Sequence, residues 1–285
     1  MPRRDVIEVR DLWYKYPEAK EWVLKGINLT IKEGDLIAIM GENGAGKTTL
    51  VKHFNGILKP DKGYVKVCGL DTREHTVAEL AKYVGLVFQN PDHQIFASTV
   101  LEETMFALKN FGWDPERAKR RAKEVLKEMG LLDYINTSPF SLSGGEKKRL
   151  TIASVLVYDP EILVLDEPTV GQDYGQKRRL AEIIERINSL GKTVIVVTHD
   201  IEFVAEYIEH VIVMSRGTII AEGEATKVLC DDNIMKRARL LPPQLGMVVK
   251  NLEDYIDFKG NFLRLPVFVE NLRRWLENDE NVKGI

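Results

Sequence analysis

The sequence predicts an α/β protein with a mostly parallel central sheet, and three observations support this fold class. Short apolar runs rich in Ile and Val recur along the chain: DLIAIM, YVGLVF, EILVLD, TVIVVT and HVIVMS. Glycine, proline or charged residues bound each run, and longer amphipathic stretches separate them. Such runs are typical of strands that crossover helices cover on both faces, as in parallel sheets.

Composition and charge limit the class of protein. The 285 residues suffice for one large domain with an appendage, or for two domains. The 40 basic and 43 acidic residues leave a net charge of −3, so nothing in the totals argues for a binder of nucleic acid or of a membrane surface. Cys68 and Cys230 have no His or Cys at metal-ligand spacing, so they indicate ordinary thiols in a reducing compartment.

No stretch of the sequence is typical of a membrane segment. The N-terminal MPRRDVIEVR contains no apolar signal segment. Uninterrupted apolar runs such as LIAIM stop at about five residues, whereas a membrane span needs roughly 20. We therefore expect any work at a membrane to be done through a partner.

The first 35 residues differ in pattern from the rest. The segments VIEVRDLWYKY and VLKGINLTIKEG alternate more and carry turn signals, as does KGYVKVCG further along. Alternation with turn residues is typical of antiparallel strands. We expect a small antiparallel layer added to the parallel sheet.

Helical patterns dominate between the strand that ends at Phe88 and the strand that begins near Ile162. In DPERAKRRAKEVLKEMG, Asp114 is a good N-cap, Pro115 suits the first helical turn, and Gly130 ends the helix. We interpret residues 91–160, approximately, as a helical subdomain inserted into the sheet.

The sequence changes character after about residue 225, where LLPPQLG breaks the pattern. We therefore expect a main domain of residues 1–225 and a C-terminal extension of residues 226–285. In the extension, an apolar helical face is formed by Phe268, Leu272, Trp275 and Leu276. This face either packs on its own domain or forms a dimer contact.

The segment GENGAGKTT matches the phosphate-loop pattern G-x-x-x-x-G-K-[ST], and it lies between an apolar run and a helical stretch. Its glycines let backbone amides turn toward phosphate oxygens, Lys47 supplies a charge for the β and γ phosphates, and Thr48 can ligate magnesium. A simple glycine turn would not explain Lys47 and Thr48 together, and a dinucleotide fingerprint would need a small residue at Thr49. We expect a nucleotide to be bound by Gly41, Glu42, Asn43, Gly44, Ala45, Gly46, Lys47, Thr48 and Thr49.

Polar residues follow three of the predicted strands. In EILVLDEP, Asp166 and Glu167 lie at the end of the predicted strand, at the edge where parallel sheets bind ligands. Magnesium is the natural partner of Asp166. Glu167 is then placed to orient or deprotonate a water molecule. Gln89 follows YVGLVF, where it can complete the magnesium shell or hold the attacking water. His199 follows TVIVVT and can contact the γ phosphate, although a histidine at a strand end is also often structural.

A second glycine-rich segment, LSGGEKKR, begins at Leu142. Ser143 and Glu146 form an S-x-x-E capping box that opens a helix through Val157. A capping box does not require glycine at its two middle positions, and each glycine lowers helix propensity by about 1 kcal/mol relative to alanine. Gly144 and Gly145 therefore indicate a backbone that something must approach closely.

Taken together, these motifs resemble a known family. GENGAGKTT, Gln89, LSGGE, ILVLDEP, PTVGQD and His199 occur in the order and approximate spacing of the nucleotide-binding subunit of ABC transporters. The resemblance covers roughly residues 5–225 and implies a P-loop NTPase of the ABC ATPase type that uses ATP and Mg²⁺. Hydrolysis would be carried by Glu167, His199, Gln89 and Lys47, and the metal would be held by Thr48, Gln89 and Asp166.

The resemblance also implies a role for the second glycine-rich segment. Two such subunits face head to tail, and each ATP lies between the phosphate loop of one and the signature loop of the other. Here that signature loop is Leu142, Ser143, Gly144, Gly145 and Glu146, with Ser143 and the Gly145 amide on the γ phosphate in trans.

The same resemblance places two further residues. Tyr16 would stack on adenine, although an aromatic in YKYP is equally a strand residue. Asp173 would lie in the loop that links the two nucleotide sites. That loop, PTVGQD, departs from the family pattern at Gln172, where leucine is common.

The run FQNPDHQIFASTVLEE and the C-terminal extension are similar to the energizing ATPase of energy-coupling-factor importers, a group that includes cobalt and vitamin transporters. The resemblance implies a homodimer or a heterodimer with a related ATPase subunit. It also implies a transmembrane coupling subunit, which residues 90–98 would contact, and a substrate-binding membrane subunit. The expected location is the cytoplasmic face of the cell membrane, as a peripheral subunit with no nucleic-acid partner.

Two other classes compete with this interpretation. A soluble ABC ATPase acting on DNA or the ribosome is supported only by the basic stretch ERAKRRAK, which also fits a solvated helix face. The sequence has a single phosphate loop and no long heptad run. A nucleotide-binding scaffold without hydrolysis would not need both Glu167 and His199.

Overall fold

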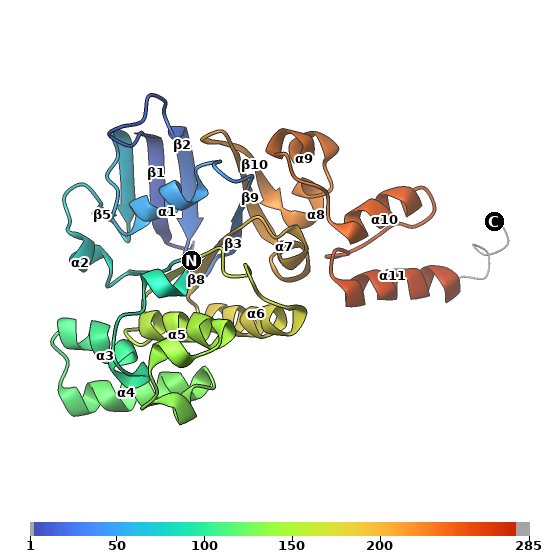
Figure 1. Cartoon of the computed structure of the whole chain (residues 1–285). Coiled ribbons are helices and arrows are strands. Elements are labelled where there is room, and N and C mark those ends of the chain that lie inside the picture. The colour runs from blue at the N-terminus through green and yellow to red at the C-terminus, as the bar shows by residue number, and fades with distance from the viewer. Residues whose placement is uncertain (1–2, 278–285) are drawn as a thin grey trace. The chain divides into compact units, whose positions relative to one another are not determined.

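The computed structural model describes residues 3–277, which form two compact units. The first unit contains residues 3–35 and 48–197, and the second contains residues 36–47 and 198–277. Each unit is therefore built from two separate segments of the chain. Figure 1 shows the helices and strands along the chain, with most of them labelled.

An antiparallel sheet of four strands lies in the first unit, in the order β2-β1-β4-β5. Its strands are β1 (Asp5–Tyr14), β2 (Leu24–Lys32), β4 (Lys62–Val67) and β5 (Leu70–Asp71). Val9 of β1 is paired with Leu29 of β2 on one side and with Val65 of β4 on the other, and all three side chains are buried. This sheet confirms the predicted antiparallel layer.

Three parallel strands also belong to the first unit, in the order β8-β7-β6. They are β6 (Val84–Val87), β7 (Ile162–Asp166) and β8 (Thr193–Thr198), of which only Thr198 is assigned to the second unit. Every residue of the three strands is buried, as predicted for strands of a parallel sheet. Their carboxyl ends share one edge, because Val87 is paired with Leu165 and Leu165 with Val196.

The helices of the first unit include several within residues 91–160, and their grouping as a subdomain stays a prediction. They are α1 (Lys47–Phe54), α2 (Val77–Leu80), α3 (Val100–Asn110), α4 (Pro115–Glu128), α5 (Gly144–Leu156) and α6 (Tyr174–Ser189), with 3-10 turns η1 (Pro91–His93), η2 (Leu132–Tyr134) and η3 (Pro139–Ser141). Helix α3 packs against α4 and α5, and α4 packs against α5 (Figure 1). Helix α4 has the predicted ends, since Asp114 accepts a hydrogen bond from the Arg117 amide at 2.9 Å and Gly130 follows with a φ of 65°.

The second unit contains β3 (Leu36–Met40), β9 (His210–Ser215) and β10 (Thr218–Glu224). Strands β3 and β9 are parallel, and β10 pairs with β9 in the antiparallel direction. Its helices are α7 (Ile201–Tyr207), α8 (Ala225–Val228), α9 (Asp232–Ala238), α10 (Gln244–Leu252) and α11 (Leu265–Glu277). Asp200 caps α7, because its carboxylate accepts a hydrogen bond from the Phe203 amide.

The predicted apolar face of the last helix is only partly covered within the second unit. Phe268 is buried and stacks on Phe258 with ring centroids 5.5 Å apart. Leu272 and Trp275 are half-buried, and Leu276 is exposed. A dimer role for this face and the domain boundary at residue 225 stay predictions.

Two features of the described residues bear on the environment of the protein. Within residues 3–277, no helix is long and apolar enough to cross a membrane. Cys68 and Cys230 are free thiols. Burial raises the pKa of Cys68 to about 12, with the nearby Glu161 carboxylate contributing, so this thiol stays protonated.

Candidate nucleotide site

The phosphate loop lies in the second unit, directly after β3, and it has the backbone that a phosphate cradle needs. Gly41, Gly44 and Gly46 have φ angles of 149°, 81° and 102°. A Cβ atom on Gly41 would lie 2.2 Å from the Met214 carbonyl oxygen, so only glycine fits there. The positive φ angles of the three glycines give the loop the kind of backbone turn that phosphate-binding loops use.

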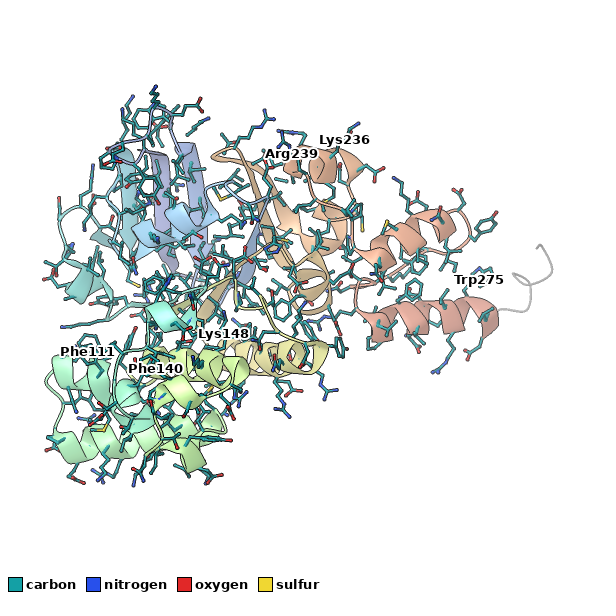
Figure 2. All side chains as sticks on the ribbon, viewed as in Figure 1. Phe111, Phe140, Lys148, Lys236, Arg239 and Trp275 are labelled. Atoms are coloured by element: carbon teal, nitrogen blue, oxygen red, sulfur yellow. The ribbon has the colours of Figure 1, made fainter. Side chains whose placement is uncertain are left out.

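Lys47 ends this loop and begins helix α1. Its ammonium group donates to the Gly41 carbonyl at 2.9 Å and to the Glu42 carbonyl at 3.2 Å, and the residue is only 6% exposed. The loop backbone thus surrounds the buried Lys47 ammonium group, which fits the predicted role of Lys47 toward phosphate. Glu42 in turn accepts from Arg239 at 3.2 Å, the residue that follows α9 (Figure 2).

Thr48 follows Lys47 in helix α1 and lies in the first unit. Its hydroxyl donates to Asp166 Oδ1 at 3.2 Å. Asp166 is the last residue of β7 and is only 4% exposed. The structure therefore brings together two of the three predicted magnesium ligands, a hydroxyl and a buried carboxylate, both of which suit a hard cation.

A preformed metal cage is absent from the described part of the chain. Residues 3–277 contain no cluster of three or more His, Cys, Asp or Glu side chains that would hold a metal ion by themselves. Magnesium commonly binds through one or two protein oxygens together with nucleotide phosphates. The pair of Thr48 and Asp166 fits that arrangement.

Glu167 follows Asp166 in a backbone conformation that is unusual for a residue with a side chain. Its φ is 47°, in the left-handed region, and its amide donates to the Val197 carbonyl at 2.7 Å. The residue is 6% exposed. Such local strain is found at functional sites, where neighbouring contacts hold it in place.

Gln89 and His199 each lie just past a buried strand, as predicted. Gln89 is exposed two residues after β6, and its carbonyl accepts from Lys148 at 2.8 Å. His199 is exposed directly after β8 and belongs to the second unit. The structure therefore places Gln89 in the same unit as Asp166 and Glu167.

Tyr16 lies close to the start of helix α1. Its hydroxyl is 3.2 Å from Thr49 Oγ1, and its ring makes an edge contact with Tyr14 at 5.1 Å between centroids. Tyr16 remains 38% exposed. An exposed aromatic face beside Thr49 is compatible with the predicted stacking on adenine, which stays a prediction.

The signature segment forms the predicted capping box at the start of α5. Ser143 accepts from the Glu146 amide, and Glu146 Oε2 accepts from the Ser143 amide at 2.8 Å and from the Ser143 hydroxyl at 2.7 Å. The hydrogen bond from the Ser143 side chain is the main cause that lowers the pKa of the Glu146 carboxyl. The Ser143 hydroxyl is thus the donor of a hydrogen bond to the Glu146 carboxylate.

The two signature glycines have different surroundings. A Cβ atom on Gly144 would meet nothing within 4 Å, whereas one on Gly145 would lie 3.0 Å from the Gln176 amide nitrogen. Packing within the chain therefore accounts for Gly145 in part, and Gly144 faces open space. Asp173 also has a local role, since it caps α6 by accepting from the Gln176 amide at 2.8 Å.

Two residues beside the predicted site were missed by sequence reasoning. Lys148 donates to the Gln89 carbonyl at 2.8 Å and lies 3.4 Å from the Glu167 carbonyl. Glu103 is buried and accepts from the amides of Phe96 and Ala97, at 3.0 and 2.8 Å. Helical spacing offered a signal for Lys148, which shares one face of α5 with the buried Gly145 and Ile152.

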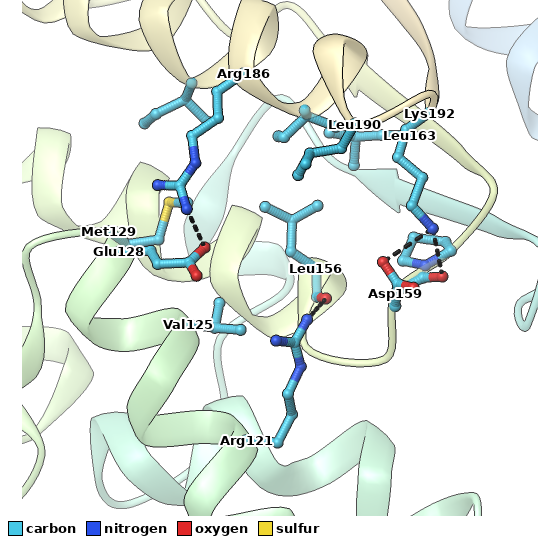
Figure 3. A pocket seen from close by; sticks show the side chains of 13 residues that line it. Arg121, Val125, Glu128, Met129, Leu156, Asp159, Leu163, Arg186, Leu190 and Lys192 are labelled. Carbon is cyan, nitrogen blue, oxygen red and sulfur yellow. Dashed lines mark hydrogen bonds and ion pairs between the residues drawn. The ribbon is translucent and has the colours of Figure 1, made fainter. Parts of the chain in front are cut away.

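A separate cavity of about 80 Å³ lies between α4, α5, β7 and α6 in the first unit (Figure 3). None of the predicted site residues lines it. Its basic side chains are already paired, Arg186 with Glu128 at 3.3 Å and Lys192 with Asp159 at 2.9 Å, while Arg121 donates to the Val157 carbonyl. This cavity is therefore no second phosphate site.

Comparison with known proteins identifies the family. The sequence profile of the family described as ABC transporter matches residues 24–170. The energy-coupling factor transporter ATP-binding protein EcfA of Methanocaldococcus jannaschii is 41% identical over 261 residues, which cover 90% of this chain and 93% of that protein. This chain belongs to the ABC transporter family, as an ATP-binding cassette. Membership implies that it binds and hydrolyses ATP.

Other relatives and solved structures agree with this family. EcfA of Methanothermobacter thermautotrophicus is 40% identical over 87% of this chain and 80% of its own length. An ABC transporter ATP-binding protein of Caldanaerobacter subterraneus is 43% identical, and the chain spans 42% of that longer protein.

Among solved structures, CbiO1 of Clostridium perfringens, described as part of the ABC transporter complex CbiONQ, matches with a TM-score of 0.74 and 34% identity over 86% of this chain and 99% of that chain. A dimeric ATP-binding cassette in a post-hydrolysis state, bound to ADP and phosphate, matches with a TM-score of 0.70 and 32% identity over 77% of this chain and 98% of that chain. Both comparisons support the ABC ATPase fold.

Proposed function

We propose that this chain is the ATP-hydrolysing subunit of an importer of the energy-coupling-factor type, and that it uses ATP with Mg²⁺. The hydrogen bond from Thr48 to Asp166 carries the proposal, because it joins the phosphate-loop helix to a buried carboxylate at the ligand edge of a parallel sheet. The 41% identity to EcfA over most of both chains supports the transporter class. The names of these relatives give no support to a soluble ATPase acting on nucleic acid or the ribosome.

Each residue of the proposed site has its own chemical role. Thr48 and Asp166, with Gln89, would hold a magnesium ion, which supplies positive charge to offset the charge of the phosphate oxygens. Glu167 orients or deprotonates the attacking water. Lys47 and His199 neutralise charge that develops on the γ phosphate.

The signature segment completes the site of a second subunit. Ser143 and the Gly145 amide of one chain contact the γ phosphate held by the other, and Asp173 links the two sites. A two-fold dimer of this kind has two equivalent composite sites. The second subunit is either another copy of this chain or a related ATPase.

The loop after Gln89 is the proposed contact with the transmembrane subunit. Phe96 is 58% exposed and forms an edge contact with Phe106 at 4.5 Å between ring centroids. The buried Glu103 carboxylate fixes the backbone beneath Phe96. An anchored aromatic pair on the surface suits a protein contact.

The proposed assembly has a main ATPase domain of residues 1–225 and an extension of residues 226–285. It would work as a peripheral subunit on the cytoplasmic face of the membrane, with a substrate-binding membrane subunit as the third component. The proposed cargo is a metal ion such as cobalt, or a vitamin.

The first test is the Glu167→Gln variant. We expect it to bind ATP, to lose turnover by about 100-fold or more, and to remain as an ATP-bound dimer. Size-exclusion chromatography with MgATP measures the dimer, and phosphate release measures turnover. A variant that hydrolyses ATP at the wild-type rate, or that stays monomeric with MgATP, contradicts the proposed mechanism.

A second test determines whether each ATP site is formed by two chains or by one chain. The Ser143→Ala chain has an intact phosphate loop, and the Lys47→Ala chain has an intact signature segment. A dimer that contains one chain of each kind therefore has one intact composite site, and a dimer of either variant alone has none. Each variant alone should be nearly inactive, and an equal mixture should recover about a quarter of the wild-type rate if pairing is random. Full activity of Ser143→Ala alone would contradict the proposed trans role of the Ser143 side chain.

A further inference from the structure

Lys148 is a buried cation that contacts two parts of the candidate site. It lies on α5, five residues after Ser143, and is only 5% exposed (Figure 2). Its ammonium nitrogen is 2.8 Å from the Gln89 carbonyl oxygen and 3.4 Å from the Glu167 carbonyl oxygen. Burial lowers its pKa, and the charges of Asp166 and Glu167 oppose this effect.

We propose that Lys148 is a positioning residue for ATP hydrolysis, which holds the backbone of Gln89 and of Glu167 in the arrangement that the reaction needs. The inference rests on the proposed function, because it assigns Gln89 and Glu167 to that site. Lys148 acts on the backbone of these residues and does not itself contact the reacting atoms.

The effect on Glu167 follows from its backbone. This residue has a φ of 47°, and its amide is fixed by the hydrogen bond to the Val197 carbonyl. Lys148 restrains the Glu167 carbonyl group by donating a hydrogen bond to it. With both peptide groups restrained, the direction of the Cα–Cβ bond of Glu167 is set, and the strained backbone conformation is maintained.

The effect on Gln89 is of the same kind. Gln89 lies in an exposed segment after β6, where its side chain is not confined by a buried core. A hydrogen bond from an ammonium group to a carbonyl oxygen is stronger than one between neutral groups. Lys148 therefore restrains an otherwise exposed backbone at the point where the loop toward Phe96 begins.

Helix α5 carries both Lys148 and residues of the signature segment. Ser143 caps the helix, and Lys148 follows about 7.5 Å further along its axis. A helix of this length moves as one rigid element, so a shift of Ser143 toward a partner's nucleotide moves Lys148 as well. Helix α5 thus connects the proposed contact of Ser143 with a partner's nucleotide to Gln89 and Glu167 of the same chain.

Another lysine of the first unit offers a matched control. Lys59 also donates to two carbonyl oxygens, those of Thr72 and His75, and none of these residues belongs to the candidate site. Burial lowers the pKa of Lys59 too. Methionine at either position keeps much of the side-chain volume and removes the charge and both hydrogen bonds.

The test compares Lys148→Met, Lys148→Arg and Lys59→Met in the full chain. We expect Lys148→Met to lower kcat by about tenfold or more, with the KM for ATP changed less than about threefold. Lys148→Arg keeps the charge and the donors and should recover part of the loss. Lys59→Met should leave kcat within about twofold of the wild type.

Binding measurements separate this role from a general loss of structure. In the Glu167→Gln background, Lys148→Met should still form the ATP-bound dimer, because the change affects the chemical step. A kcat within about twofold of the wild type for Lys148→Met, or an equal loss for Lys59→Met, overturns the inference. If Lys148→Met does not fold, Lys148→Gln takes its place, since glutamine keeps a donor without the charge.

The outcomes for the two proposals are distinct. If Glu167→Gln remains fully active, the proposed function fails. If Glu167→Gln loses turnover and Lys148→Met does not, only the positioning role of Lys148 fails.

Discussion

Thr48 and Asp166 are separated by 118 residues in the sequence, and the Thr48 hydroxyl donates a hydrogen bond to Asp166 Oδ1 at 3.2 Å. The contact joins the first turn of α1 to the end of β7. Both side chains are oxygen donors, and Asp166 is buried. The pair is therefore the best-defined part of the proposed magnesium site.

The first prediction concerns the dependence of ATP binding on magnesium. Asp166→Asn keeps an oxygen that accepts from Thr48 but removes the charge. We expect its affinity for ATP with Mg²⁺ to fall about tenfold or more, and its affinity in EDTA to be unchanged or slightly tighter, because a charge that repels phosphate is gone. Calorimetric titration with and without Mg²⁺ measures the difference. The matched control is Asp159→Asn at an exposed site, and an unaltered magnesium dependence of Asp166→Asn would contradict the assignment.

The second prediction concerns the signature segment. The Ser143 hydroxyl donates to the Glu146 carboxylate, and this anion would lie near the partner's γ phosphate. Glu146→Gln keeps the capping acceptor and removes the charge, so we expect ATP-dependent dimerisation to strengthen by about threefold to tenfold in the Glu167→Gln background. Sedimentation at several protein concentrations measures this change. Glu116→Gln, in the first turn of α4, is the control, and weaker dimerisation of the Glu146 variant would refute the prediction.

The third prediction concerns stability in acid. Burial lowers the pKa of His53 from 6.5 to about 4, while its Nδ1 atom contacts the Thr49 carbonyl at 2.7 Å. Between these two values the unfolded chain binds more protons than the folded chain, so the free energy of unfolding falls as pH is lowered from 6.5 to 4. The expected loss from this residue is about 3 kcal/mol.

Denaturant unfolding at several pH values tests the role of His53. We expect His53→Gln to reduce the slope of stability against pH in this range, whatever its effect at neutral pH. His75→Gln is the matched control, because His75 contacts the Asp71 carbonyl four residues earlier in the same way and is less buried. An identical slope for wild type and His53→Gln would exclude the assigned cause.

The fourth prediction concerns the membrane contact. Phe96→Ala removes half of the exposed aromatic pair with Phe106 and leaves the Glu103 hydrogen bonds to the backbone in place. We expect unchanged ATPase activity of the isolated chain and at least about tenfold weaker co-purification with the transmembrane subunit. Phe140→Ala removes an aromatic of similar exposure outside residues 90–98. Equal retention of the membrane subunit by Phe96→Ala and the wild type would exclude this contact.

Local sequence patterns were sufficient to predict the elements that carry the site. The apolar runs became β3, β6, β7, β8 and β9, because strands buried on both faces need continuous apolar side chains. The caps at Asp114 and Ser143 formed as predicted, because a cap depends on residues only a few positions apart. The glycines of the phosphate loop took positive φ angles for the same local reason.

The contacts between distant segments could not be predicted in the same way. The sequence of GENGAGKTT indicates that Thr48 binds a metal, but only the folded chain brings Thr48 to Asp166. The anchoring of the loop at Phe96 by Glu103 also depends on packing, since an isolated glutamate in a helix is usually exposed.

Lys147 and Lys148 show most directly what the sequence determined and what the tertiary structure decided. The sequence determined that a capped helix begins at Ser143 and carries both lysines. Successive residues of a helix point about 100° apart, so the two lysines face different surroundings. Packing of α5 against β6 accompanies the contacts of Lys148 with the Gln89 and Glu167 carbonyl groups, whereas Lys147 pairs with Asp92 near the surface. Identical side chains thus acquired different contacts, because burial and neighbours arise only when the helix is placed in the fold.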